Sequence, residues 1–300
     1  MAPMGKTREI KKRIKAVGNI RRITKTMQMI ATSKFARAQQ AAVASKPYSS
    51  ALLDLVQHLA AAMGAGGDGI SHPLLESGAR NKPRSGKDLT LVITSERGLC
   101  GPYNGSVMRT AMTFLRANPS ARGGFVEVAG KKGAGFFKYA GVSVSKLHQF
   151  GDKVKYEAVR ALAEDYTRRF IAGEVSSVRV VSMKFQSASR QAPQVMQLLP
   201  FQPPAGPPRS NGGMAELLEF SPGAPELLDS LLPAAVRALL FQAFNDAVVS
   251  EHVARMVAMK SATDNAGKAG KRYTRVYNRA RQAQITTELT EIISGAAALT

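Results

Sequence analysis

The stretch VRALLFQAFNDAVVSEHVARMVAMKS, residues 236–261, decides the fold. Its small and apolar residues recur at steps that alternate between four and three, at Val236, Leu240, Ala243, Ala247, Ser250, Ala254, Val257 and Ser261. An average spacing of about 3.5 residues is the mark of a left-handed coiled coil. Because most of these residues are small, two helix backbones can approach each other closely. The stretch therefore predicts a long helix that packs along a second long helix.

The N-terminal residues supply a candidate for that second helix. An apolar face recurs at steps of three or four, at Ile10, Ile14, Val17, Ile20, Ile23, Met27 and Ile30. This pattern predicts one helix over residues 6–62, which would be about 85 Å long and would need a partner helix. We expect an N-terminal stalk helix in residues 1–62 and a C-terminal stalk helix in residues 223–300, paired as an antiparallel coiled coil.

The end of the chain changes character twice. Beyond Ser261 the same phase falls on polar residues, and it becomes apolar again at Ile285, Leu289, Ile292, Ala296 and Leu299. In an antiparallel pair this last stretch overhangs the first helix. An overhanging apolar stripe needs a surface on another chain to cover it.

The middle of the chain has a different pattern. Strands are predicted over residues 89–94, 125–129, 142–147 and 177–185, and helices over 103–117, 130–139 and 156–171. Strands that alternate with helices indicate a mainly parallel sheet with covered faces. We expect a Rossmann-like α/β domain in residues 87–200, followed by a Pro/Gly-rich linker and a short strand (216–220) within residues 201–222. The fold class is thus α/β plus a long coiled coil.

The charge of the chain is strongly positive. Its net charge is +21, and residues 1–46 hold 12 Lys and Arg residues but only one acid, Glu9. Such a charge predicts an acidic protein partner, a nucleic acid or an anionic membrane surface. No run of about 18 apolar residues is present, so we expect no membrane span. The single cysteine, Cys100, excludes an internal disulfide and indicates a reducing compartment.

Motifs for catalysis and cofactors are missing. The G-x-x-x-x-G-K-[S/T] phosphate loop is absent, and the turn from Gly98 to Gly101 lacks the G-x-G-x-x-G spacing of a dinucleotide site. A tight turn between strand and helix explains these glycines better. The four histidines have no metal-ligand spacing and are expected at a surface or interface, and Cys100 is expected to be a buried thiol. We predict no catalytic residue, cofactor or metal.

Three segments together resemble the gamma subunit of the F-type ATP synthase. They are ITKTMQMIATSK (23–34), SERGLCG (95–101) with Asn104, and a C-terminal set of RMVAMKSATDN (255–265), YNRARQAQITTELTE (277–291) and GAAAL (295–299). Their order and spacing also match, so the resemblance covers nearly the whole chain. The sequence departs from the family at Pro102-Tyr103, where Gly-Leu is frequent, and at Pro233 in the start of the last helix.

The resemblance implies a function. The chain would be the non-catalytic central rotor shaft that couples proton flow through the membrane ring to the conformational cycle of the catalytic beta subunits. The implied partners are the alpha and beta subunits, the epsilon subunit and the c-ring, at the cytoplasmic face of a bacterial inner membrane. No organellar transit peptide is expected, since the helical pattern begins almost at once. The residues implied to contact the stator are Met27, Arg255, Arg281, Gln282, Ile285, Thr286, Leu289, Ile292 and Leu299.

Two other classes of function remain open from the residues alone. A basic coiled coil could bind nucleic acid, although scarce aromatic residues disfavour binding to single strands. The α/β domain could instead belong to a small nucleotide-dependent enzyme. Tight, salt-dependent duplex binding would identify the first, and binding of ATP or NAD by the domain would identify the second.

Overall fold

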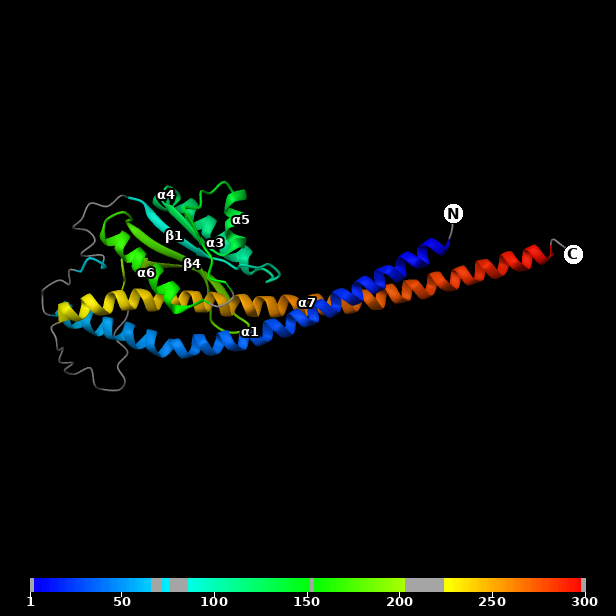
Figure 1. Ribbon diagram of the computed structural model, residues 1–300, viewed down its shortest axis with the longest axis horizontal. Coiled ribbons are helices and arrows are strands. Elements are labelled where there is room, and N and C mark those ends of the chain that lie inside the picture. Colours follow the sequence, from blue (N-terminus) through cyan, green and yellow to red (C-terminus); the bar gives the residue numbers. More distant parts are fainter. Residues whose placement is uncertain (1–2, 66–71, 76–85, 152–153, 203–223, 298–300) are drawn as a thin grey trace. The chain divides into compact units, whose positions relative to one another are not determined.

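The computed structural model describes residues 3–65, 72–75, 86–151, 154–202 and 224–297 (Figure 1). The chain divides into two compact units. Unit 1 comprises Met1–Ser33 and Arg255–Thr300, and unit 2 comprises Lys34–Ala254. Helix α1 (Pro3–Ala65) and helix α7 (Ala224–Ala297) each contribute to both units. The predicted strand at 216–220 and most of the predicted linker lie outside the described residues.

Unit 1 is a pair of antiparallel helices. Thr263 Oγ1 donates a hydrogen bond to Thr24 Oγ1 at 2.8 Å, and Thr7 Oγ1 donates one to Gln284 Oε1 at 3.1 Å. The partner on α7 moves toward the C-terminus as the partner on α1 moves toward the N-terminus. The predicted antiparallel pairing of the two terminal helices is therefore confirmed in this unit.

Unit 2 combines the remainder of both long helices with a five-stranded sheet. Within it, Asn245 Nδ2 of α7 donates to Ser45 Oγ of α1 at 3.3 Å. The shorter elements are α3 (Tyr103–Ala117), α4 (Pro119–Arg122), α5 (Lys131–Tyr139) and α6 (Tyr156–Ile171), with strands β1 (Asp88–Ile93), β2 (Phe125–Ala129), β3 (Lys146–His148), β4 (Ser177–Phe185) and β5 (Gln191–Leu199). The predicted helices and the first, second and fourth predicted strands agree closely with these bounds.

The sheet has the strand order β3-β2-β1-β4-β5. The pairs β1–β2, β1–β4 and β2–β3 are parallel, as predicted, whereas β4 and β5 are antiparallel. Strand β5 was not predicted from the sequence. It contains Pro193 and lies at the edge of the sheet, where a residue without an N–H group is tolerated.

Helices cover both faces of the sheet (Figure 1), and an apolar core lies against each face. On one face Leu89 and Leu91 of β1 pack with residues of α6, α7 and the C-terminal part of α1. On the other face Val92 packs with residues of α3 and α5, such as Val107 and Phe137. Alternate residues of the buried central strand thus supply both cores, as the period of a β-strand requires.

The seam between the two long helices differs from the predicted one. In unit 2, Ala247 of the predicted row lines the small cavity beside Ile93 of β1 and Ala129 of β2. Phe244, which is not in that row, lines the same cavity and contacts Phe150 at a ring distance of 4.7 Å. Ser45 of α1 forms hydrogen bonds with Gln242 and Asn245 of α7, which lie outside the predicted row. Helix α7 has two buried faces in this unit, and the more regular apolar row covers the α/β domain.

The predicted face of α1 is also only partly correct. Ile10 is buried, but Ile20, Ile23 and Ile30 are 50%, 58% and 52% exposed. The side chains that face α7 in unit 1 follow a stricter spacing of about 3.5 residues, which the structure identifies at Ile10, Ile14, Val17, Thr24 and Ala31. On α7 they are Met259, Thr263, Ala266, Gly270, Tyr273, Tyr277, Ala280 and Gln284.

Helix α7 is the one helix among the described residues that is long and apolar enough to cross a membrane. That property follows from length and composition alone, and 44% of the apolar stretch is buried. Residues such as Leu232 and Leu240, which are fully buried in the core of unit 2, contribute to this apolar character. A core helix of this kind passes the same test as a membrane span.

Candidate functional site

The first candidate surface is the free end of α7 in unit 1. Gln284 of α7 accepts a hydrogen bond from Thr7 near the start of α1. Beyond it, four large apolar side chains are exposed by 53%, 55%, 73% and 59%, namely Ile285, Leu289, Ile292 and Ile293. The expected apolar overhang is therefore present. Exposed apolar rows of this kind mark surfaces that another molecule covers.

The expected stator-contact residues all belong to unit 1. Met27 lies on α1 and is half-buried, and Arg255, at the start of the α7 portion, is half-buried as well. Arg281, Gln282 and Thr286 are exposed on α7, together with Ile285, Leu289 and Ile292. Leu299 lies outside the described residues. The structure thus places six of these residues along one exposed stretch of about three helical turns.

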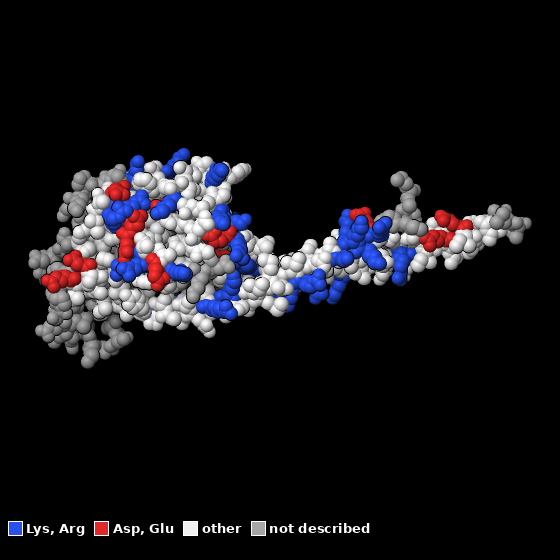
Figure 2. Space-filling view, viewed as in Figure 1, with Lys and Arg blue, Asp and Glu red and all other residues white. Residues whose placement is uncertain are grey.

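Positive charge gathers on the helices of unit 1 (Figure 2). Exposed Lys and Arg side chains project from both helices, and they are Lys11, Lys12, Arg13, Lys15, Arg21, Arg22 and Lys25 of α1, with Lys268, Lys271, Arg272, Arg275, Arg279 and Arg281 of α7. Glu9 forms an ion pair with Arg13 at 2.6 Å. A surface with so many cations attracts an acidic partner.

A groove in unit 2 is also lined by positively charged side chains. It has a volume of about 680 Å³ and an apolar floor that includes Phe241 and Val248 of α7. It is lined by Lys34 and Arg37 of α1 and by Lys155, just before α6, and Glu157 is the one acid among the described residues that line it. Its size suits a small ligand or a few side chains of a partner.

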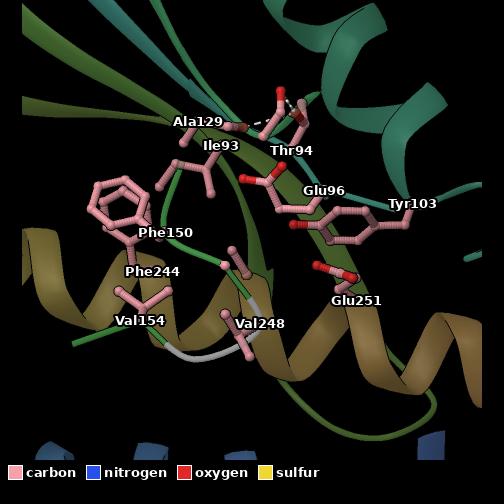
Figure 3. Close-up of a pocket in the computed structure, with 13 residues that line it drawn as sticks. Ile93, Thr94, Glu96, Tyr103, Ala129, Phe150, Val154, Phe244, Val248 and Glu251 are labelled. Atoms are coloured by element: carbon pink, nitrogen blue, oxygen red, sulfur yellow. Dashed lines mark hydrogen bonds between the residues drawn. The ribbon is translucent and has the colours of Figure 1, made fainter. Parts of the chain in front are cut away.

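The crevice where a dinucleotide would bind is filled. In open parallel sheets, ligands bind outside the carboxyl ends of the strands. At this position, beside Ile93 of β1 and Ala129 of β2, the cavity measures only about 30 Å³. Figure 3 shows Phe150, and Phe244 and Val248 of α7, occupying the space. A cavity of this size holds about one water molecule, so the geometry argues against a nucleotide-dependent enzyme.

The glycine turn after β1 is held by side chains of its own neighbourhood. Asn104 Oδ1 accepts a hydrogen bond from the backbone N–H of Ser95 at 3.0 Å, and Asn104 Nδ2 donates to Ser95 Oγ at 2.7 Å and to Cys100 Sγ at 3.2 Å. Leu99 and Gly101 have positive φ angles of 63° and 55°. The predicted tight turn and the predicted buried Cys100 thiol are both confirmed.

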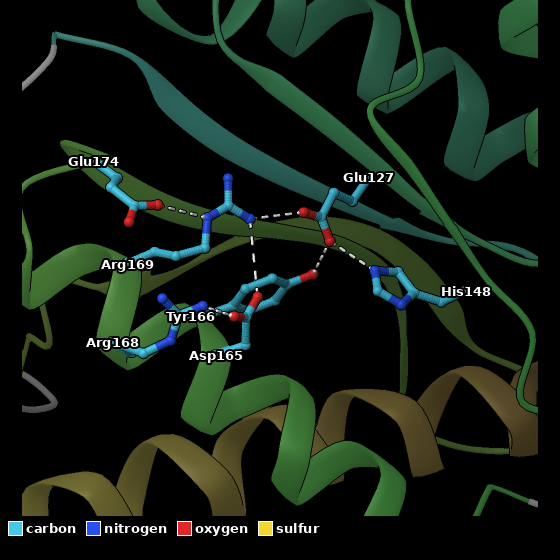
Figure 4. Close-up of polar contacts among 7 residues, drawn as sticks. All are labelled: Glu127, His148, Asp165, Tyr166, Arg168, Arg169 and Glu174. Carbon is cyan, nitrogen blue, oxygen red and sulfur yellow. Dashed lines mark hydrogen bonds and ion pairs between the residues drawn. The ribbon is translucent and has the colours of Figure 1, made fainter.

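A buried polar cluster centres on Glu127 of β2 (Figure 4). His148 Nε2 lies 2.6 Å from Glu127 Oε2, and the hydroxyl group of Tyr166 donates to the same oxygen at 2.8 Å. Arg169 Nη1 donates to Glu127 Oε1 at 2.8 Å, and Arg169 Nε lies 3.5 Å from a carboxylate oxygen of Glu174. The cluster joins β2, β3 and α6.

The electrostatics of the cluster favour an ionised Glu127. Burial opposes the charge of the carboxylate, but the hydrogen bonds from His148, Tyr166 and Arg169 outweigh it, so the pKa of Glu127 is lowered. Burial, followed by the negative charge of Glu127, raises the pKa of Tyr166 well above its ordinary value. The donors to Glu127 come from β3 and α6 of the same domain, so the evident role of the cluster is to fix the domain.

The histidines lie deeper than the sequence predicts. His252 is 7% exposed and His72 is 9% exposed, and the side chain of His148 is 11% exposed. His72 Nε2 lies 3.1 Å from Asp229 Oδ1, and burial lowers the pKa of His72. Of the two expected positions, surface or interface, the surface is therefore wrong for His72 and His252. Spacing in the sequence gave no signal of the carboxylates beside His72 and His148, which come from other elements of the fold.

Comparison with known families gives a single result. A sequence model described as ATP synthase matches residues 6–299. The chain is 39% identical over 303 residues to the ATP synthase gamma chain of Rhodopirellula baltica, with 99% of each chain covered. It is 36% identical over 299 residues to the ATP synthase gamma chain of Pelotomaculum thermopropionicum, with 99% of this chain and 100% of the relative covered.

Solved structures share the fold. A chain of the mitochondrial ATP synthase of Euglena gracilis superimposes with a TM-score of 0.65, at 16% identity, over 98% of this chain and 95% of that one. A chain from the central stalk and c-ring structure of the Tetrahymena thermophila enzyme gives a TM-score of 0.56 at 19% identity, over 80% of this chain and 99% of that one.

Proposed function

This chain belongs to the ATP synthase gamma-chain family, and from that premise we propose that it is the central rotor shaft of an F-type ATP synthase. In this function it couples proton flow through a membrane ring of c subunits to the conformational cycle of the catalytic beta subunits, in ATP synthesis or hydrolysis. The chain itself is non-catalytic. The cavity at the carboxyl ends of β1 and β2, where a dinucleotide would bind, measures only about 30 Å³ and agrees with that assignment.

The observation that carries the proposal is the exposed apolar end of α7. A shaft that turns inside a ring of subunits needs a surface without fixed hydrogen bonds, because each such bond would have to break at every step. Ile285, Leu289 and Ile292 offer such a surface, because their side chains are hydrocarbon and are exposed beyond Gln284, which bonds to Thr7 of α1. We assign this end to the sleeve formed by alternating alpha and beta subunits.

The polar residues beside that end have a different role in the proposal. Arg281, Gln282 and Thr286 are exposed on α7, and we assign them to contacts with a loop near the catalytic sites. Met27 and Arg255, which also belong to unit 1 but are farther from the C-terminal end of α7, contribute to the same stator contact. We assign Leu299, which lies outside the described residues, to the same stator contact.

The positive charge is assigned to acidic segments of the beta subunits rather than to nucleic acid. The groove beside Lys34, Arg37 and Lys155 supports this choice, because it pairs cations with an apolar floor. A protein segment with acidic and apolar side chains complements both features, whereas a phosphate backbone complements only the first. The epsilon subunit and the c-ring are the further partners in this assignment.

The proposed location follows from the complex. The chain is held at a membrane as a peripheral subunit, and we place it at the cytoplasmic face of a bacterial inner membrane. The relatives reported above that share more than a third of its residues are bacterial gamma chains. Fractionation of membranes, with release of the chain by removal of the catalytic head, tests this placement.

Copurification is the decisive experiment. Tagged full-length chain should recover alpha, beta and epsilon subunits from solubilised membranes. A second strain should express the chain without residues 285–300, and its vesicles should show reduced proton-driven ATP synthesis relative to ATP hydrolysis. Recovery of nucleic acid without alpha and beta subunits, or full coupling in the truncated complex, would refute the proposal.

A further inference from the structure

Residues 72–75 form a short segment that packs into the core of unit 2. The side chains of Leu74 and Leu75 are buried in the apolar core that also includes Leu59 of α1 and Leu228 of α7. Phe201, which follows β5, donates its backbone N–H to the carbonyl oxygen of Leu74 at 2.7 Å. The segment is therefore held by apolar contacts and by a backbone hydrogen bond to a distant part of the chain.

The ring of His72 adds a polar attachment through both of its nitrogen atoms. Nδ1 accepts a hydrogen bond from the backbone N–H of Leu74 at 3.1 Å, and Nε2 lies 3.1 Å from Asp229 Oδ1 of α7. Because a carboxylate oxygen only accepts, Nε2 carries the proton and Nδ1 carries the lone pair. One neutral tautomer of the ring thus satisfies both contacts.

A second proton on this ring would disrupt the attachment. Protonation of Nδ1 would place two N–H donors, those of the ring and of Leu74, opposite each other. Leu74 is only 1% exposed, so its N–H would lose its acceptor in a place that water does not reach. The charge of the imidazolium would itself be buried, since 11% of the His72 side chain is exposed.

One nearby carboxylate favours the charged ring, but weakly. The Asp229 side chain is 76% exposed, so water screens its charge. Burial lowers the pKa of His72, and Asp229 offsets this effect only in part. The other titratable groups on the last turns of α1 and the first turns of α7 are Asp54, His58 and Glu226, and none of them shifts the pKa of His72. The neutral ring is therefore the form that fits the folded chain.

We propose that His72 is a pH-sensitive latch within unit 2. While its ring is neutral, the latch fastens residues 72–75 to the start of α7. Uptake of one proton at Nδ1 breaks the bond to the Leu74 N–H, and the segment opens locally. This device is a property of the chain alone and goes beyond the proposed function, so it can be tested without the other subunits.

The pH range of the opening follows from the direction of the pKa shift. The opened segment takes up a proton near the ordinary pKa of 6.5, and the closed segment does so only at lower pH. The latch therefore contributes fully above pH 6.5, and its contribution is lost as the pH falls from 6.5 through the lower folded pKa. The lowered pKa of Glu127 places its titration below pH 4.5, outside this range.

Hydrogen exchange on the full-length chain tests the latch. The amides of Leu74, Leu75 and Phe201 should lose up to about tenfold in protection between about pH 7.5 and about pH 5.5, after correction for the intrinsic effect of pH on exchange. Amides of β1 in the same unit should keep their protection. Protection of the three amides that does not change with pH, or that falls equally in β1, would overturn the proposal.

His72→Asn removes the titration but keeps an acceptor. The Asn oxygen can accept the N–H two residues on, as in an Asx turn, so the pH dependence of the three amides should disappear. The matched control is His58→Asn, at a half-buried histidine of α1, which should show the pH dependence of the parent. A pH dependence that survives in His72→Asn would refute the latch.

Asp229→Asn distinguishes a latch from a purely structural contact. The Asn oxygen still accepts from Nε2, but the negative charge that favours the imidazolium is gone, so opening should begin at lower pH than in the parent. An unchanged pH range, or a shift to higher pH, would contradict the proposal. This shift also decides the matter if the segment in His72→Asn is open at every pH.

Discussion

The carboxylate of Glu127 accepts a hydrogen bond from Arg169 Nη1 at 2.8 Å, across 42 positions of sequence, with only 3% of the Glu127 side chain exposed. The guanidinium group also lies over the ring of Phe125, with its Cζ 5.0 Å from the ring centre. This contact fixes helix α6 on strand β2. A charged group this deep is stable only while its partners remain.

Removal of the charge should therefore destabilise unit 2. Glu127→Gln keeps the shape of the side chain but leaves Arg169 without a carboxylate at its closest contact. We expect the free energy of unfolding to fall by about 3 kcal/mol, measured by urea denaturation. Glu164→Gln is the control, because Glu164 forms an exposed pair with Arg160 at 2.7 Å and should show no measurable change. Equal stability of both variants would contradict the role given to the cluster.

The same cluster predicts the pH dependence of stability. The pKa of Glu127 is lowered in the folded chain from its ordinary value of 4.5. Its ionised form therefore stabilises the fold above pH 4.5, and this contribution is lost as the pH falls from 4.5 through the lower folded pKa. The difference in stability between the parent and Glu127→Gln should be constant near neutral pH and shrink in acid. A stability difference that grew on acidification would contradict this prediction.

Two glycines on α5 should respond oppositely to alanine. A Cβ atom on Gly133 would lie 2.6 Å from Thr94 Oγ1 and 2.8 Å from Val128 Cγ1, whereas one on Gly135 would meet nothing within 4 Å. We expect Gly133→Ala to lower the free energy of unfolding by about 2 kcal/mol through overpacking. Gly135→Ala should raise it by up to about 1 kcal/mol through helix propensity. Thermal and urea unfolding measure both, and a stable Gly133→Ala variant would contradict the close packing of α5 on the sheet.

The apolar end of α7 should matter to the complex and not to the chain. Ile292 and Leu289 are 73% and 55% exposed. Changing both to Ser should leave thermal unfolding of the chain unaltered, because little buried surface is lost. In vesicles it should lower proton-driven ATP synthesis. A matched change, Thr290→Ser on the same turn, should alter neither measurement. A drop in the unfolding temperature of the double variant would show that these side chains pack within the chain itself.

The long helices and most of the α/β elements followed from the sequence because their signals are local. Alternating strands and helices between residues 89 and 185 gave bounds that agree with β1, α3, β2, α6 and β4. Strand β5 was not predicted, because Pro193 and a mixture of polar and apolar side chains hide the two-residue alternation of a strand. An edge strand tolerates both features. The buried cluster escaped because Glu127, His148 and Arg169 meet only after the sheet has formed.

The repeat of α7 shows where local pattern ends. The sequence by itself determined that α7 is a long helix with rows of small and apolar residues. A repeat at steps of three and four residues is a local property of one helix and needs no knowledge of its neighbours. It did not determine which row meets α1, because two rows of α7 are buried in unit 2 and periodicity treats them alike. Tertiary structure decided that Ala247 of the predicted row lines the cavity beside Ile93 of β1 and Ala129 of β2, whereas Asn245 meets α1. The physical reason is that burial depends on what lies opposite a residue, and a neighbour contributed by a distant segment leaves no trace in local spacing.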